Sequence, residues 1–287
     1  MKKVLFPFEI GHECYREAYV YAIKVTRNLG AELIMLNTFE IDVDNTITEE
    51  RYENLKKKNW IIAHQEVLRF HDYYLNNHAR VDFELRVRVD YRFYNGKLIE
   101  EFRDIIHNED IDLVVIPATS KSESTRKTLK LMRRDVLNKN HMSLLAIPCE
   151  SDFQNIDHLL LIAEPKFLNS PAMYMEEITL FAQVFYSAVH AVQLSRQAEE
   201  TREEEEKARI IARFPKSMTH RVSYHRIKGS DPDTGLLEYM SENHISLMAI
   251  SRQQKHMIGR IFRSDTLEEM CSTFGIPVLI LKDGPPD

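Results

Sequence analysis

The sequence lacks the features that indicate a membrane, secreted or nucleic-acid-binding protein. No apolar run among its 287 residues approaches the length that spans a bilayer. Met-Lys-Lys at the start could open a signal peptide, but Glu9, Glu13, Arg16 and Glu17 follow too soon for its apolar core. The formal net charge of -6 is mild and gives no reason to expect binding to nucleic acid or to an anionic membrane. We therefore expect a cytoplasmic protein that binds neither nucleic acid nor membrane.

Cysteine is also scarce. Cys14, Cys149 and Cys271 are an odd number without close spacing, which argues against a disulfide framework and a cysteine metal cluster. His12, Glu13 and Cys14 are consecutive, and consecutive side chains diverge around a helix, so they could not meet on one metal without distant partners. No nucleophile elbow or Ser-His-Asp order is visible. We expect no metal, no catalytic residue and no enzyme with a defined turnover.

What the sequence does contain is an internal duplication. Residues 111–137 and 245–271 each have a short apolar run, a polar loop and a stretch with helical spacing, and a constant offset of 134 aligns them. One supersecondary unit that occurs twice at one spacing is typical of a duplicated domain. The sequence therefore predicts two domains, residues 1–150 and 151–287.

Apolar patterning predicts the same order of elements in both halves. Continuous apolar runs are typical of buried parallel strands, and apolar residues three or four apart indicate helices between them. The first half should have strands at 3–8, 32–39, 81–89, 113–116 and 143–147, and helices at 15–29, 49–77, 97–107 and 124–138. The second half should have strands at 159–163, 188–194, 220–228, 247–250 and 277–281, and helices at 170–186, 199–213 and 235–242, with a fourth helix before the last strand. The predicted fold class is α/β, with two tandem doubly wound, mostly parallel five-stranded sheets and helices on both faces.

The two halves differ in length in their middle. The offset between the acidic residues after the first strands, Glu9 and Glu164, is 155, whereas it is 134 later in the chain. The first half therefore carries 21 extra residues. We place them in the loop at 41–48 and in a longer second helix.

This arrangement resembles the universal stress protein family in its tandem form, with two such domains in one chain. The segments that carry the resemblance are KVLFPFE, NLGAELIMLNTF, IDLVVIP and SLLAIP in the first half, and HLLLIAE, ISLMAIS and GIPVLIL in the second. The resemblance implies an adenine nucleotide alpha hydrolase-like fold and a role in the stress response. It also implies that the two domains pair through their fifth strands, and it makes a homodimer possible.

Members of that family that bind ATP carry a glycine-rich loop after the fourth strand: Gly, two residues, Gly, nine residues, Gly, then Ser or Thr. Glycine lets backbone N–H groups approach phosphate oxygens at the start of a helix. All six glycines are absent from this sequence. The corresponding positions are Pro117, Ser120 and Lys130 in the first half, and Ser251, Gln254 and Ser264 in the second.

Other residues at these loops also disfavour a phosphate. Pro117 removes an N–H donor, and Asp265 would place a carboxylate where the phosphate should lie. Nucleotide-binding members have Asp after the first strand, where this chain has Glu9 and Glu164. We therefore expect degenerate nucleotide loops, no cofactor, and a stress-response protein that acts through contacts with an unidentified protein partner. The alternative is an adenine-nucleotide (ATP) binding module or weak ATPase.

The first loop remains the better candidate for an anion. Its cations are Lys121, Arg126, Lys127 and Lys130. They could bind an anion in place of backbone amides, or the loop hydroxyls could be phosphorylated. The simpler interpretation is an exposed loop that enters a helix with Ser122 or Ser124 as its N-cap. If either half holds phosphate or sulfate, we expect it against residues 119–130.

Overall fold

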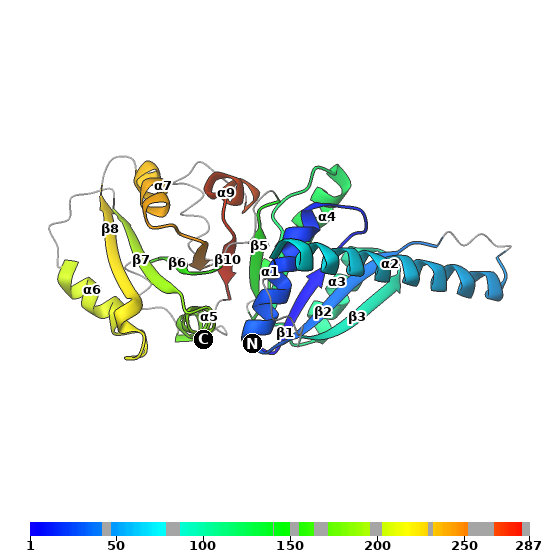
Figure 1. Cartoon of the computed structure of the whole chain (residues 1–287), viewed down its shortest axis with the longest axis horizontal. Coiled ribbons are helices and arrows are strands. Elements are labelled where there is room, and N and C mark those ends of the chain that lie inside the picture. Colours follow the sequence, from blue (N-terminus) through cyan, green and yellow to red (C-terminus); the bar gives the residue numbers. More distant parts are fainter. Residues whose placement is uncertain are drawn as a thin grey trace. The chain divides into compact units, whose positions relative to one another are not determined.

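The structure is a computed structural model that describes residues 1–41, 47–78, 87–139, 141–149, 155–163, 172–195, 203–228, 232–251 and 267–282. Strands and helices alternate along the chain (Figure 1). The first half contains β1 (Lys3–Pro7), α1 (Cys14–Leu29), β2 (Glu32–Phe39), α2 (Glu49–His78), β3 (Arg88–Asn95), α3 (Leu98–Asn108), β4 (Leu113–Pro117), α4 (Glu123–Leu137) and β5 (Ser143–Ile147). The second half contains β6 (His158–Ile162), α5 (Ala172–Val184), β7 (Ala188–Ser195), α6 (Glu203–Ile211), a 3-10 helix (Thr219–Arg221), β8 (Val222–Lys228), α7 (Pro232–Glu242), β9 (Leu247–Ser251), α9 (Leu267–Phe274) and β10 (Val278–Leu281).

The chain divides into two compact units. The first comprises Met1–Lys139 and Ile147–Phe153, and the second comprises Asn140–Ala146 and Gln154–Asp287. The strand order is β3-β2-β1-β4 in the first unit and β5-β10-β9-β6-β7-β8 in the second. The pairs β1–β2, β1–β4 and β2–β3 are parallel, as are β6–β7, β6–β9, β7–β8 and β9–β10. The predicted class, a mostly parallel α/β fold, is confirmed.

Most of strand β5 is grouped with the second unit rather than with the rest of its own half. It runs antiparallel to β10, with Ala146 opposite Val278 and Leu144 opposite Ile280. The Ser143 hydroxyl donates to the Glu177 carboxylate of α5 at 2.7 Å and accepts the N–H of Lys282 at 2.9 Å. The division between the units therefore falls within β5, with Ser143–Ala146 in the second unit and Ile147 in the first.

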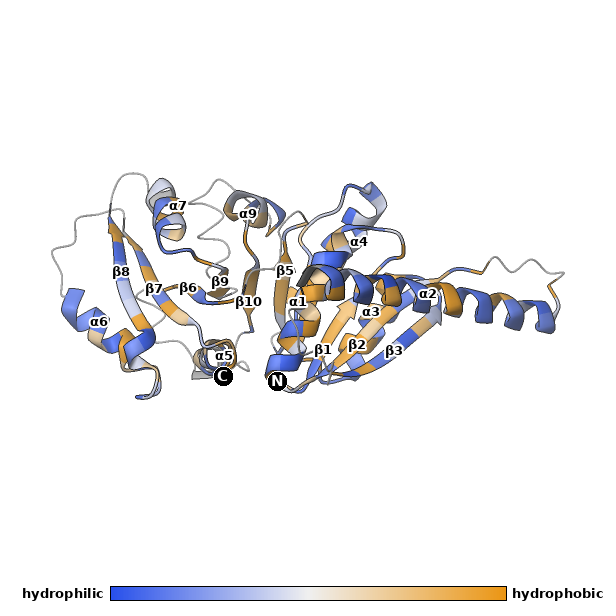
Figure 2. Ribbon diagram, in the orientation of Figure 1, coloured by the Kyte–Doolittle hydropathy of each residue, from blue (hydrophilic) through white to orange (hydrophobic). Residues whose placement is uncertain are grey.

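The central strands of the first unit are buried throughout, which explains their continuous apolar runs. All five residues of β4 are buried, and Figure 2 shows the apolar character of β1 and β2. Helices α1 and α2 lie in front of these strands in Figure 1. Phe8, after β1, packs against Phe70 of α2 with ring centroids 5.4 Å apart. Aromatic packing therefore attaches the C-terminal half of α2 to the sheet.

Strand β3 lies later in the chain than the sequence pattern predicted. The expected strand was 81–89, of which residues up to 86 lie outside the described residues. The strand that forms is Arg88–Asn95, and all eight of its residues pair with Glu32–Phe39 of β2. The apolar residues continue to alternate, from Val87 and Val89 through Tyr91 and Phe93. The two-residue period therefore predicted a strand here, but it did not show at which residue the strand begins. β3 ends the strand order of its unit, at the edge where its alternation had placed it.

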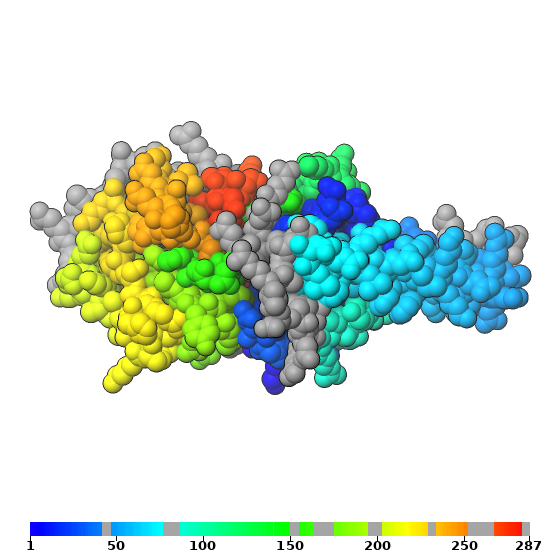
Figure 3. Space-filling model, in the orientation of Figure 1, coloured from blue at the N-terminus to red at the C-terminus, as the bar shows by residue number. Residues whose placement is uncertain are grey.

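The long second helix expected in the first half is confirmed. α2 has 30 residues, Glu49–His78, where the sequence predicted a helix over 49–77. Only the second half of α2 is anchored, through the buried side chains of Ala63, Val67, Phe70 and Tyr74. The first turns of α2 stand out from their unit (Figure 3). None of the described helices combines the length and apolar character needed to cross a membrane.

Candidate functional site

The candidate site lies in the first unit, where β1 and β4 end. These strands are parallel neighbours, with Val4 opposite Leu113 and Leu5 opposite Val114. Their carboxyl ends therefore share one edge of the sheet, which is where parallel α/β sheets usually bind ligands. Glu9 follows β1, and the segment 118–122 leads from β4 into α4.

Three side chains meet at the first turn of α4. The buried Thr125 hydroxyl donates to Glu9 Oε2 at 2.6 Å. His12 Nε2 lies 3.2 Å from the same hydroxyl and 3.6 Å from Glu9 Oε2. A helix N-terminus favours negative charge, so the Glu9 carboxylate beside the first turn stabilises α4.

The backbone of the segment after β4 is bonded to other parts of the same unit. The Ala118 N–H donates to the Ile147 carbonyl at 2.7 Å, and the Ala118 carbonyl accepts from the buried Arg133 guanidinium of α4. The Thr119 carbonyl accepts the Cys149 thiol at 2.6 Å. These bonds hold the segment in one conformation and occupy groups that a ligand would need.

Side chains cap the start of α4. The Ser122 N–H donates to Ser120 Oγ at 3.2 Å, and Ser122 Oγ accepts the Thr125 N–H at 3.4 Å. Ser122 is therefore the N-cap, one of the two residues expected from the sequence. Ser120, at a lost glycine position, is buried and serves the turn. The N–H groups of residues 118, 122 and 125 are therefore bonded within the unit.

The cations of this segment face solvent. Lys121, Arg126, Lys127 and Lys130 are all exposed. Lys127 Nζ lies 2.8 Å from the Glu123 carboxylate, one turn away. Exposed, well-hydrated cations hold an anion only loosely. Binding of an anion against residues 119–130 stays a prediction.

The remaining predicted positions are less informative. Pro117 is the buried last residue of β4. In the second half, Ser251 ends β9 and is partly buried. Glu164, Gln254 and Ser264 lie outside the described residues.

Helix α2 also contacts the edge where β1 and β4 end, which we call the mouth of the first unit. Gly11 turns the segment after β1 with a φ of 82°, in the left-handed region that favours glycine. Its N–H donates to Glu66 Oε1 of α2 at 3.2 Å, and Glu66 also pairs with Arg69 at 2.9 Å. The buried Glu66 therefore ties the loop that carries Glu9 and His12 to the long helix.

Sequence reasoning missed a pair of thiols beside this site. Cys14 begins α1 and Cys149 follows β5, and the Cys149 thiol influences the pKa of Cys14. The interaction with Cys149 and then burial raise the pKa of the Cys14 thiol well above its ordinary value. The two residues are far apart in the sequence, so no spacing pattern could have marked them. Among the described residues, no group of three or more His, Cys, Asp or Glu side chains is placed to hold a metal ion.

Comparison with solved structures identifies the fold. Over 99% of its length the chain matches 97% of a universal stress protein from Archaeoglobus fulgidus, with a TM-score of 0.63 and 11% identity. The chain has a universal stress protein fold. It also matches a functionally unknown protein from Pseudomonas aeruginosa PAO1, with a TM-score of 0.50 and 12% identity, over 99% of this chain and 93% of that one. No protein-family model and no curated protein matches the sequence.

The second unit of this universal stress protein fold holds a separate cluster around the buried His190. His158 Nδ1 lies 3.0 Å from His190 Nε2, and His190 Nδ1 lies 2.9 Å from the Tyr239 hydroxyl. The His225 ring stacks on Tyr239, with centroids 4.7 Å apart. Burial, and then repulsion from His158, lower the pKa of His190 to about 4. His190 is therefore neutral at pH 7.

Replacing Thr125 with valine should lower the free energy of unfolding by weakening the contacts at the candidate site. The change keeps the side-chain shape but leaves the partly exposed Glu9 carboxylate without its hydroxyl donor. A hydrogen bond to a charged group contributes about 1.5 to 3 kcal/mol, and solvent access to Glu9 reduces the loss to about 1 to 2 kcal/mol. Urea unfolding followed by circular dichroism measures this loss of unfolding free energy. Thr128→Val removes only a bond to the Ser124 carbonyl on the exposed side of α4 and should cost under about 0.5 kcal/mol. Equal losses for the two variants would contradict the role given to Thr125.

The histidine cluster should make the protein less stable in mild acid. Between about pH 6.5 and the His190 pKa of about 4, the unfolded chain binds a proton that the folded chain does not. The free energy of unfolding should therefore fall as pH falls through this window. Urea unfolding at several pH values measures it. His190→Gln should flatten the dependence, whereas His220→Gln, at an exposed histidine, should leave it unchanged. Identical pH profiles for His190→Gln and the unmodified protein would count against this assignment.

Proposed function

We propose that this protein is a cytoplasmic stress-response protein that acts through contacts with another protein, without enzymatic turnover and without a bound nucleotide. The observation that carries the proposal is the closed mouth of the first unit. There the Glu9 carboxylate occupies the α4 N-terminus through Thr125, and the segment after β4 is bonded to its own unit. The fold supports a relationship to stress proteins, and the mouth argues against nucleotide as the ligand.

Helix α2 supplies a surface suited to protein contact. Its side chains Trp60, Ile61, Ile62 and Leu68 are 46%, 52%, 38% and 50% exposed. A hollow of about 360 Å³ is lined, among the described residues, by Glu53, Lys56, Lys57, Trp60 and Ile61. Exposed apolar residues gathered in this way are typical of interaction sites.

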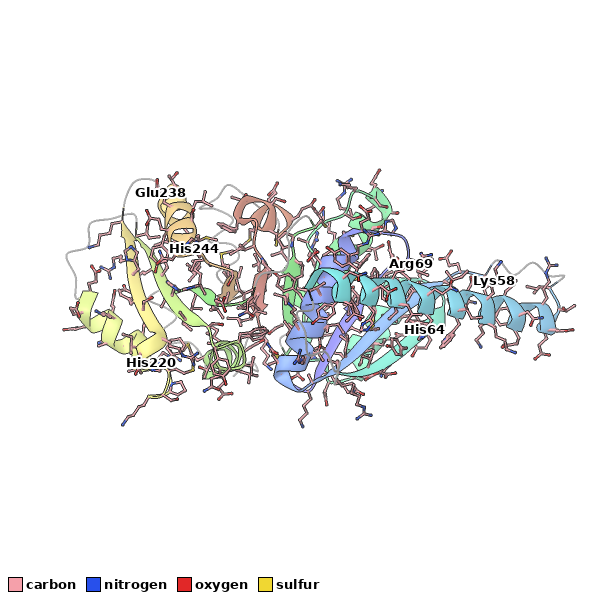
Figure 4. All side chains as sticks on the ribbon, in the orientation of Figure 1. Lys58, His64, Arg69, His220, Glu238 and His244 are labelled. Atoms are coloured by element: carbon pink, nitrogen blue, oxygen red, sulfur yellow. The ribbon has the colours of Figure 1, made fainter. Side chains whose placement is uncertain are left out.

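The orientation of α2 leaves part of this surface open. His64 packs towards β3, with its ring 5.5 Å from that of Tyr91, and its ring stacks on Trp60 with centroids 5.1 Å apart. Figure 4 marks Lys58, His64 and Arg69 along α2. Lys58 and Arg69 are exposed. Packing on one side holds Trp60 in place, while its remaining surface stays available to a partner.

The competing function, binding of an adenine nucleotide, predicts a different response to ATP. We expect no rise in melting temperature when magnesium and millimolar ATP are added, because the mouth is filled by the protein's own groups. A ligand at a hundred times its dissociation constant would stabilise the protein by about 2.7 kcal/mol, a shift of several degrees. A shift that disappears in the double variant Arg126→Ala, Lys127→Ala would establish the nucleotide function instead and place it at the first loop.

If the protein binds its partner through α2, replacing the exposed apolar side chains of α2 should weaken that binding. The double variant Trp60→Ser, Ile61→Ser should recover at least tenfold less partner protein from extracts of stressed cells, since anchors of this kind contribute about 2 kcal/mol each. Quantitative mass spectrometry of the captured proteins provides the measurement. Leu237→Ser, at a 37% exposed leucine of α7, is the matched control and should leave capture unchanged. Equal capture by both variants, with helix content intact, would refute contact through α2.

A further inference from the structure

Strand β3 forms the outer edge of the sheet in the first unit. It ends the strand order beside β2 (Figure 1), and within the described part of the chain no strand pairs with its other side. Its eight residues, Arg88–Asn95, pair one by one with Glu32–Phe39, so no bulge interrupts it. An edge of this kind presents a row of backbone N–H and C=O groups with which a further strand can pair.

The edge lacks the features that usually discourage such pairing. Natural edge strands carry lysine or proline, or they are bulged or very short. The sequence of β3, RVDYRFYN, contains neither lysine nor proline. Its arginines have acidic partners inside the unit. Arg88 Nε lies 2.9 Å from the Glu32 carboxylate, and Arg92 pairs with Asp90 at 2.8 Å and with Glu109. The charge on β3 that could repel another strand is therefore largely compensated.

The two faces of β3 differ in character, because side chains alternate along a strand. Tyr91 and Phe93 lie on the face towards α2, with their rings 5.5 and 5.9 Å from ring side chains of that helix. By alternation, Asp90 and Arg92 lie on the opposite face with Tyr94. Tyr91 and Tyr94 remain 41% and 38% exposed. A strand added at this edge must therefore match an apolar face and a charged face.

A second copy of β3 meets this requirement in one register. Directly opposite residues of an antiparallel pair lie on the same face, so a two-fold axis between two copies passes at one residue. With Asp90 or Arg92 at the axis, like charges face each other, which is destabilising. With Tyr91 at the axis, Asp90 of each copy faces Arg92 of the other, and residues 88–94 are all paired. The Arg92 guanidinium has five N–H donors, so it can keep Glu109 while it reaches the facing carboxylate.

The same register matches the apolar face. Val89 of each copy faces Phe93 of the other, and the two Tyr91 rings are adjacent. Aromatic and β-branched pairs of this kind stabilise neighbouring strands. Backbone pairing, charge and apolar contacts therefore agree on one antiparallel arrangement.

We propose that β3 is a self-association edge, at which a second copy of this chain adds its own β3 in antiparallel orientation with Tyr91 at the two-fold axis. The inference goes beyond the proposed function, because it concerns two copies of this chain and needs no other protein. One pair of strands is a small interface, so the dimer is reversible and its population depends on protein concentration.

Sedimentation equilibrium of the full-length protein, from micromolar to near-millimolar concentration, tests the association. The average mass should rise from one chain towards two. Tyr91→Lys should stay monomeric where the unmodified protein is mostly dimeric, because it places two ammonium groups opposite each other at the axis. Tyr186→Lys, at an 82% exposed tyrosine outside the strands, is the control and should dimerise normally.

Two results of this experiment would overturn the proposal. An unmodified protein that is monomeric at every concentration would leave the β3 edge to an extended segment of another protein. Equal dimerisation of Tyr91→Lys and the unmodified protein would place the contact elsewhere. The mass of the unmodified protein decides the first point even if a variant fails to fold.

Cross-linking tests the register. Tyr91→Cys and Tyr94→Cys replace tyrosines of similar exposure on the same strand. In the proposed dimer the two positions 91 are directly opposite, with Cα atoms about 5 Å apart, a separation that a disulfide spans. The two positions 94 lie about 20 Å apart along the strands. Oxidised glutathione should therefore link two chains through position 91 and not through position 94, with peptide mapping to identify the linked cysteines. Equal linking of both variants, or no link through position 91, would contradict the register.

Discussion

The parallel pairing of β1 with β4 is the constraint on which the candidate site depends. Because the strands run the same way, the segments that follow them emerge at one edge, and Glu9 comes next to the start of α4. The same geometry brings the ends of α1 and β5 there, with Cys14 and Cys149. At this edge a carboxylate, hydroxyls and backbone groups bond to one another.

Much of the fold follows from the sequence because burial leaves a strong pattern. The five residues of β4 are all buried, and a fully buried strand must be apolar throughout. The length of α2 could be read from the offset between the halves, which counts residues without reference to their structure. The start of β3 could not, because its alternation extends on both sides and the partner strand β2 decides which residues pair.

The position of the site could be predicted from the sequence, but the side chains that meet there could not. The order of elements indicated the edge concerned. The groups that meet there could not be read, because Thr125 and Glu9 are 116 residues apart and their bond depends on the rotation of α4. The spacing of residues along the chain shows which side chains lie on the same helix or strand. Packing decides which distant helices and strands come into contact.

The exposed half of α2 has no explanation in the stability of its own unit. Its anchored half, with Phe70 and Glu66 buried, nucleates the helix, so the preceding turns need only propagate it. Polar residues are sufficient for this propagation, as the ion pair between Glu53 and Lys56 at 3.5 Å illustrates. Trp60 and Ile61 gain little for the fold in such a place, because half of their surface remains in water. The second unit has the same order of elements, and its equivalent helix α6 is described over Glu203–Ile211. A long helix that exposes its largest apolar side chains therefore points to a contact outside the unit, which is the argument for protein binding that the closed mouth alone could not supply.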